Sequence, residues 1–201
     1  MAPTMVNFGF LPVKRTVFFL CDIQESYRGE QLYFDEVLQT AEKMVQASKT
    51  FGIPLIVTEQ CPMQNGRTVK ELDVSHAHGI YPKTKFSMAI PEVNEQLDKL
   101  CDGNVQCGVL FGMQAHISIE QTAAELCGLG IQVHVIADAC TASSQEERIL
   151  ALQRLKQIGC FITTCESILY KLLGDEDHPK ANEVKQLLDK PRPPTGLAVL
   201  L

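Results

Sequence analysis

Short apolar runs alternate along this chain with longer segments of helical periodicity. Five runs are almost continuously apolar, as expected for strands that are buried on both faces: TVFFLCD (16–22), IPLIVTEQ (53–60), VQCGVLFG (105–112), IQVHVIADAC (131–140) and CFITT (160–164). A further short strand is expected to end in KTKFSMA (83–89). The pattern therefore predicts a sheet of about six strands, which is a common size.

Helical periodicity fills the intervals between these strands. In the segment 33–52 apolar residues recur at spacings of three and four, and Gly52 provides the expected end. The segment 143–159 begins with two overlapping capping boxes, Ser143/Glu146 and Ser144/Glu147. Further helices are predicted within 91–100, 118–130 and 165–175.

Alternation of strands and helices is typical of a parallel sheet that lies between two helical layers. We therefore expect an α/β fold: a three-layer α/β/α domain over 1–201, with a Rossmann-like sheet in the strand order 3-2-1-4-5-6. The segment 61–82 shows no periodicity and contains an Asn65-Gly66 turn signal. A long irregular loop of this kind commonly forms a pocket wall or a lid.

Composition narrows the class of protein further. The chain has 201 residues, of which 45% are hydrophobic and 21% charged, so one large domain with a full core is expected. The net charge of −6 and the scattered Lys and Arg residues disfavour a nucleic-acid partner. No apolar run approaches the length of a membrane span, and the start lacks a secretory layout. We predict a cytoplasmic protein without a membrane partner; a short organelle signal stays an open alternative.

Cysteine and histidine usage gives no metal or disulfide signature. The eight cysteines include no C-x-x-C pair, and most lie in apolar runs, which favours buried free thiols in a reducing compartment. His76 and His78 form an H-x-H pair in the irregular segment, but two ligands alone are more typical of a solvated surface. We therefore predict neither a metal nor a cofactor.

Candidate chemistry lies where the predicted strands end. In open parallel sheets, sites form beyond the carboxyl ends of the strands. This rule selects Asp22, Lys83 and Lys85, His116 and Ser118, and Asp138. Each has a simpler alternative as a helix cap, a turn residue or a solvated charge. The turn GMQAHIS (112–118) is not G-x-S-x-G, and the chain has no phosphate-binding glycine motif, so neither a serine-hydrolase elbow nor a nucleotide site is indicated.

Four motifs in register give a more specific indication. FLCDIQ (19–24), KTKFSM (83–88), GMQAHISIEQTA (112–123) and VHVIADAC (133–140) together resemble the isochorismatase-like hydrolase superfamily. The resemblance covers nearly the whole chain in order. It is closest to the isochorismatase domain-containing subgroup of animals and protists, which the later segment 143–169 also resembles.

The resemblance implies a catalytic set of Asp, Lys and Cys, which corresponds here to Asp22, Lys83 and Ser118. The Asp acts as base, the Lys orients it, and the nucleophile lies at a helix N-terminus. The resemblance also implies a non-proline cis peptide at Met113–Gln114 and an oxyanion hole from the N–H groups of Gln114 and Ser118. Further residues expected around a small-molecule pocket are Gln24, Tyr27, Gln60 and His116.

The chain departs from the family pattern at the nucleophile. A serine hydroxyl is a far weaker acid than a thiol, so a carboxylate–lysine pair suited to cysteine is a poor base for Ser118. Nicotinamidase activity is disfavoured as well, because TEQCP (58–62) lacks the metal ligands of those enzymes. Three interpretations remain: a hydrolase in which Asp22 works with water, a weak serine nucleophile, and a non-catalytic binding or scaffold protein. We expect Ser118 within hydrogen-bond reach of Asp22 in the first turn of its helix.

The tail GLAVLL (196–201) motivates a prediction about assembly. Its apolar residues follow a proline-rich break and have no partner within their own segment. Such a tail tends to dock in a groove, often on a neighbouring subunit, and members of the resembled family are commonly dimers or larger. We therefore predict a homo-oligomer.

Overall fold

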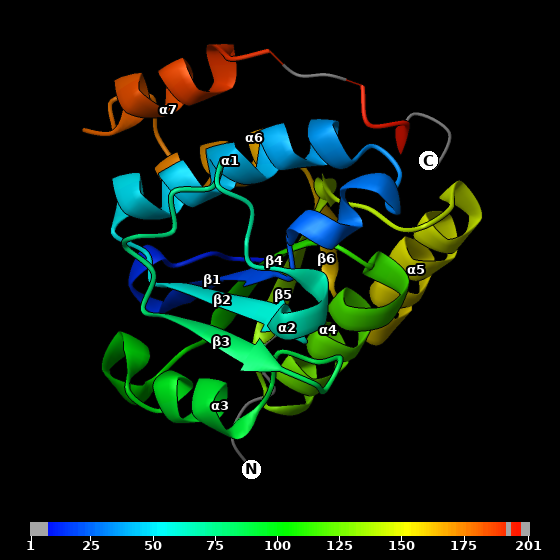
Figure 1. The fold of residues 1–201 in the computed structure, drawn as a ribbon. Coiled ribbons are helices and arrows are strands. Elements are labelled where there is room, and N and C mark those ends of the chain that lie inside the picture. Colours follow the sequence, from blue (N-terminus) through cyan, green and yellow to red (C-terminus); the bar gives the residue numbers. More distant parts are fainter. Residues whose placement is uncertain (1–7, 192–193, 198–201) are drawn as a thin grey trace.

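The computed structural model describes residues 8–191 and 194–197. Six strands form one sheet in the order β3-β2-β1-β4-β5-β6, and all neighbouring strands pair in parallel (Figure 1). The predicted α/β class and strand order are confirmed. The strands are β1 Thr16–Cys21, β2 Leu55–Gln60, β3 Gly79–Lys83, β4 Cys107–Gly112, β5 Gln132–Cys140 and β6 Phe161–Thr163.

Helices cover both faces of this sheet (Figure 1). One layer contains α1 (Phe34–Phe51) and α6 (Cys165–Leu173), with α7 (Ala181–Asp189) packed outside them. The other layer contains α3 (Pro91–Leu97), α4 (Glu120–Gly128) and α5 (Gln145–Ile158). The short helix α2 (Pro62–Asn65) follows β2, and 3₁₀ turns occur at Val13–Arg15, Glu25–Gly29 and Leu100–Gly103.

Burial along the strands explains their apolar sequences. All six residues of β1, β2 and β4 are buried, because these central strands have helices on both faces and strands on both sides. Phe18 and Phe111 meet edge to face in this core, with ring centroids 6.3 Å apart. In β3, at the edge of the sheet, burial alternates instead, and Ile80 is 44% exposed.

Local end signals form where the sequence predicts them. Gly52 ends α1 in the left-handed conformation, with φ 65°. Ser144 Oγ accepts a hydrogen bond of 3.2 Å from the Glu147 N–H at the start of α5, so the second of the two predicted capping boxes provides the cap. These two signals define the end of α1 and the start of α5.

The segment 61–82 corrects the prediction of a wholly irregular loop. It contains α2 and most of β3, because β2 offers an open edge with which residues from Gly79 onward pair. The helix α7 was not predicted either. None of the described helices combines the length and the apolar character that crossing a membrane requires.

The tail docks on its own chain in its described part. Arg148 Nη1 donates to the Thr195 carbonyl, Gln145 Nε2 donates to the Gly196 carbonyl at 2.7 Å, and Leu197 packs against the core. A buried guanidinium needs acceptors, and this segment supplies one. The groove that the described part of the tail, Gly196 and Leu197, occupies thus belongs to the same chain and not to a neighbour, and 198–201 lie outside the described residues. Homo-oligomer formation stays a prediction without this support.

Candidate functional site

Strand register brings the predicted residues to one edge of the sheet. Cys21 pairs with Thr58 of β2 on one side and with Gly112 of β4 on the other. Asp22 therefore follows its strand at the level where β4 ends, while β2 continues to Gln60. Gln60 pairs with Lys83 at the end of β3, which carries the lysine to the same edge.

Asp22 and Lys83 form a fully buried ion pair. Lys83 Nζ lies 2.7 Å from Asp22 Oδ2, and neither side chain has exposed surface. Thr58 Oγ1 donates a 2.8 Å hydrogen bond to Asp22 Oδ1, so both carboxylate oxygens are held. Outside water, such a pair is stable only when further hydrogen bonds satisfy both charges.

Lys83 meets that requirement with three neutral acceptors. Its ammonium group donates to Gln60 Oε1 at 2.6 Å, to the Phe86 carbonyl at 2.8 Å and to the Lys85 carbonyl at 3.2 Å. The segment after β3 therefore wraps around the lysine. Gln60 thus contacts Lys83 directly, and its amide nitrogen also donates to the Thr84 carbonyl at 2.8 Å.

Two polar neighbours of Asp22 escaped sequence reasoning. One is Thr58, and the other is Cys21, whose Sγ lies 3.4 Å from Asp22 Oδ2. Complete burial, followed by the adjacent Asp22 charge, raises the pKa of the Cys21 thiol well above its usual range. Cys21 is thus a protonated donor to the carboxylate. Cys21 ends β1, and the pairing of Cys21 with Thr58 brings the threonine to the same carboxylate.

Ser118 makes no hydrogen bond to the Asp22–Lys83 pair. It belongs to a π-helical turn, Ala115–Ile119, that leads into α4, and it is fully buried. Its Oγ has no hydrogen-bond partner among the described residues, so the expected hydrogen bond to Asp22 is absent there. The π turn inserts an extra residue per turn, which changes the direction of the Ser118 side chain relative to an α-helix. Its carbonyl accepts a 2.6 Å hydrogen bond from Thr122 Oγ1.

The turn before Ser118 also differs from the expectation. The Met113–Gln114 peptide is trans, as are all described peptide bonds. The chain turns instead through Gln114, which has the left-handed conformation φ 58°, ψ 61°. The Met113 N–H donates to the Cys21 carbonyl at 3.0 Å and the Ala115 N–H to the Thr141 carbonyl at 2.8 Å. Both flanks of the turn are thus tied to neighbouring strands.

Strained backbone concentrates at this edge. Asp22 has φ 51°, and Gly112 has φ 140°. A Cβ on Gly112 would lie 2.0 Å from the Cys21 carbonyl oxygen, so only glycine allows β4 to approach the end of β1 so closely. Left-handed non-glycine residues cost about 1–3 kcal/mol each and cluster at functional sites.

The remaining predicted pocket residues have different environments. Gln24 is buried and bonds backbone groups of Gln60 and Gly66, at 2.6 to 3.0 Å, so its amide is used structurally. Tyr27 accepts a 3.2 Å hydrogen bond from Asn65, and burial raises its pKa to about 12. His116 is half-buried, and its Nδ1 lacks a partner within the described part of the chain.

Comparison with known proteins identifies the family. Residues 16–167 match the family model of the Isochorismatase domain. The chain belongs to the isochorismatase family. Isochorismatase domain-containing protein 2 of Xenopus laevis is 43% identical over 194 residues, spanning 96% of this chain and 93% of that protein. Isochorismatase domain-containing protein 1 of Danio rerio is 40% identical over 193 residues, spanning 96% of this chain and 68% of that protein.

A solved structure supports the same family and confirms the fold. The protein described as MAR1 ribonuclease from Caenorhabditis elegans superposes with a TM-score of 0.88 at 36% identity, covering 94% of this chain and 97% of that one. The predicted resemblance to the isochorismatase domain-containing subgroup is therefore confirmed, together with the parallel sheet.

Other candidate residues of this isochorismatase-family domain lie outside the cluster. Lys85 is exposed and pairs with Glu125 at 2.6 Å. Asp138 Oδ1 accepts a 2.8 Å hydrogen bond from the Cys165 N–H at the start of α6. His76 contacts Ser48 Oγ at 2.7 Å, and the described residues contain no group of three or more potential metal ligands.

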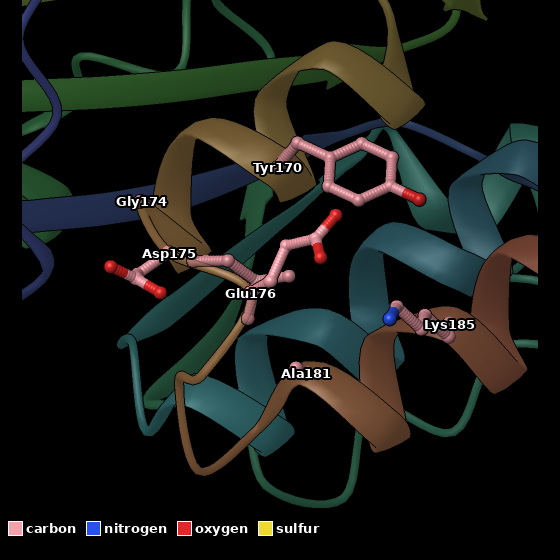
Figure 2. Close-up of a pocket in the computed structure, with 7 residues that line it drawn as sticks. Tyr170, Gly174, Asp175, Glu176, Ala181 and Lys185 are labelled. Atoms are coloured by element: carbon pink, nitrogen blue, oxygen red, sulfur yellow. The ribbon is translucent and has the colours of Figure 1, made fainter.

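Access to the cluster is closed in this structure. Asp22 and Ser118 are 0% exposed and Lys83 is 5% exposed. A surface hollow lies elsewhere, between α6 and α7, as Figure 2 shows with Tyr170 on α6 and Ala181 and Lys185 on α7. Its lining includes no member of the Asp22 cluster, so we assign the candidate chemistry to the buried edge of the sheet.

Proposed function

We propose that this chain is a hydrolase of a small molecule in which Asp22 transfers the proton, Lys83 orients Asp22, and water is the nucleophile. One observation carries the proposal: both oxygens of the Asp22 carboxylate are held, while Ser118 Oγ has no partner among the described residues. A serine hydroxyl attacks only when an adjacent base takes its proton. The arrangement supports proton transfer at Asp22 without a covalent intermediate on Ser118.

Hydrolysis of a vinyl ether suits this set of groups. The Lys83 ammonium group passes a proton to Asp22, Asp22 delivers it to the vinyl carbon, and water adds to the resulting oxocarbenium carbon. The hemiketal collapses to a ketone and an alcohol, and the proton released by the water returns to Asp22. The 2.7 Å contact lets Asp22 pass this proton back to the Lys83 amine, which restores the ammonium group and the ion pair.

A substrate must reach Asp22 through a transient opening. The segment after β3 is the natural one to move, because Phe86 is 48% exposed while its carbonyl holds Lys83. Displacing this segment removes two acceptors of the ammonium group, the carbonyls of Lys85 and Phe86. Opening of this kind is a common gating step in enzymes.

The second candidate is a non-catalytic small-molecule-binding or scaffold protein, and the complete burial of Asp22 and Ser118 favours it. In this alternative the ion pair is only a structural remnant.

A ribonuclease activity, which the C. elegans relative is described as having, receives little physical support, because the net charge of −6 repels a polyanion.

The deciding experiment is a turnover assay on vinyl ethers, small amides and single-stranded RNA. We expect vinyl ether hydrolysis that falls by roughly 10²- to 10⁴-fold in Asp22→Asn, the usual contribution of a general acid–base group. Ser118→Ala is the matched control and should keep its rate within about threefold. Equal loss in both variants contradicts the water mechanism. Binding by calorimetry without any turnover supports the second candidate.

Opening of the site has its own test, the variant Ser118→Cys. We expect iodoacetamide to label the new thiol faster than Cys140, which is fully buried with its pKa raised by burial to about 12. A new thiol as inert as Cys140 contradicts both the opening and the hydrolase proposal.

A further inference from the structure

Two cysteines that are distant in sequence meet at the opposite end of α4 from Ser118. Cys127 lies in the last turn of α4, and Cys160 lies between the glycine that ends α5 and the start of β6. Their Sγ atoms are 4.0 Å apart, across a separation of 33 residues. This contact takes no part in the Asp22 cluster.

Exposure differs between the two thiols. Cys160 is 6% exposed, whereas Cys127 is half-buried and presents part of its surface to solvent. A small reagent therefore reaches Cys127 first. Cys21 and Cys140 are 0% exposed and have no such access.

Proton sharing makes Cys127 the more acidic member. The hydrogen bond from the Cys160 thiol, together with the Val133 backbone N–H, lowers the pKa of Cys127 to about 7, although its burial acts in the opposite direction. The pKa of Cys160 is raised, because its proton is held in the contact with Cys127 and the site is buried. A thiolate beside a protonated thiol is the usual arrangement of an attacking and a resolving cysteine.

We propose that Cys127 and Cys160 form a redox site that reacts with a hydroperoxide and closes to a reversible intramolecular disulfide. The Cys127 thiolate attacks a peroxide oxygen: an S–O bond forms, the O–O bond breaks, and the leaving oxygen takes a proton to give water or an alcohol. Cys127 is thereby oxidised to a sulfenic acid. Cys160 then loses its proton and attacks Cys127 Sγ, an S–S bond forms, and the S–O bond breaks to release water.

The local backbone allows this closure. A disulfide requires the sulfurs at about 2.05 Å, so the two atoms must approach by about 2 Å. Both cysteines lie next to turns that glycines make, Gly130 with φ 81° and Gly159 with φ 105°. Nothing lies within 4 Å of a Cβ built on either glycine, so these turns have room to shift.

The test uses the reduced wild-type chain and hydrogen peroxide. After treatment, free thiols are alkylated and the protein is mapped by mass spectrometry without reduction. We expect loss of two alkylation sites, a mass lower by two hydrogen atoms, and one cross-linked peptide that joins Cys127 to Cys160, all reversed by dithiothreitol. Continued alkylation of both residues, a disulfide between other cysteines, or a cross-link between two chains overturns the proposal.

Three variants check the order of events. In Cys160→Ser the reaction should stop at the sulfenic acid of Cys127, which dimedone traps. In Cys127→Ser neither product should form. The matched control is Cys101→Ser, since Cys101 is also half-buried but its pKa is raised by burial; there the Cys127–Cys160 disulfide should form at the wild-type rate. Dimedone labelling at Cys160 in Cys127→Ser contradicts the assigned roles.

Discussion

Lys83 and Arg148 are both cations with almost no exposed surface, yet their polar partners differ. Lys83 lies against the Asp22 carboxylate and three neutral oxygens at the edge of the sheet. Arg148 donates to the backbone carbonyls of Thr195 and Ala137, the latter at 2.9 Å, and its Nε has no partner among the described residues. The guanidinium also lies 5.9 Å from the ring of Tyr33.

The two cations differ in the groups that compensate them: Lys83 has a charged partner, whereas Arg148 connects two backbone segments. Lys83 and Asp22 are opposite charges that each compensate the other, and the strands that carry them are separated by β2. Arg148 joins the 194–197 segment to β5 by donating to backbone carbonyls, which are neutral and provide no counter-charge. Burial alone therefore does not mark a functional cation; the chemistry of its acceptors does.

The largest expected effect is that of Lys83→Met. This change leaves the Asp22 carboxylate buried without its counter-charge, which typically costs 3–5 kcal/mol, so we expect a loss of about 4 kcal/mol in the free energy of unfolding. Urea unfolding followed by circular dichroism measures it. Adding Asp22→Asn to the same chain should recover part of the loss, and a double variant no more stable than Lys83→Met would contradict mutual dependence.

His134 extends the comparison to a basic group that stays neutral when buried. Burial above all, with help from Lys171, lowers its pKa from 6.5 to about 4. The unfolded chain therefore binds more protons between these values, so stability is fully present above pH 6.5 and falls as the pH drops toward 4. The loss amounts to about 3 kcal/mol, at 1.36 kcal/mol per pKa unit. His134→Gln should flatten the pH dependence of urea unfolding across that window, and an unchanged slope would contradict it.

Arg148→Met should have a smaller effect than Lys83→Met. Two buried carbonyls lose a charged donor, but no charge is left without its counter-charge, so we expect a loss of about 2 kcal/mol. Limited proteolysis should also cleave the tail faster. The control is Arg154→Met on the same helix, whose exposed ion pair with Glu120 contributes about 0.5 kcal/mol or less. Equal losses of unfolding free energy in Lys83→Met and Arg148→Met would contradict the expected difference between a cation with a charged partner and one with neutral partners.

Ser118→Ala should have the smallest effect. Removing a buried hydroxyl that has no partner should leave stability within about 1 kcal/mol of the wild type, on the stabilising side. Ser48→Ala is the matched control, because Ser48 is equally buried but donates to the Val45 carbonyl at 2.7 Å; its loss should be about 1–2 kcal/mol. Thermal unfolding of both variants measures the contrast, and a clear loss in Ser118→Ala would indicate a hydrogen bond to Ser118.

Sequence reasoning predicted the sheet because its signals are local and repeated. Continuous apolar runs identified the central strands, and the strand-end rule together with the family resemblance selected Asp22 and Lys83, which do meet. The roles of Thr58 and Cys21 were missed, although their strands were predicted, because contacts at a strand end depend on the register between neighbours. Register describes which residues of two strands pair, so the sequence of one strand alone does not give it.

The orientation of Ser118 and the geometry of its turn depend on still longer-range contacts. The position of the turn follows from ties to Cys21 and Thr141, which precede and follow it by many residues. A π turn and a left-handed Gln114 are responses to those ties, and the residues themselves do not favour either. For the same reason the edge strand β3 was predicted only at its end, since pairing with β2 defines its length.

Pro82, next to Lys83, has a consequence for association between chains. The Lys83 carbonyl accepts from the Cys61 N–H and so faces the sheet, which turns the backbone of Pro82 toward the open edge. Proline has no N–H there, so a strand added from another molecule would lose a ladder hydrogen bond at that position. The strand that carries the buried lysine is thus protected against edge-to-edge growth of the sheet and against the fibrillar aggregation that such growth begins.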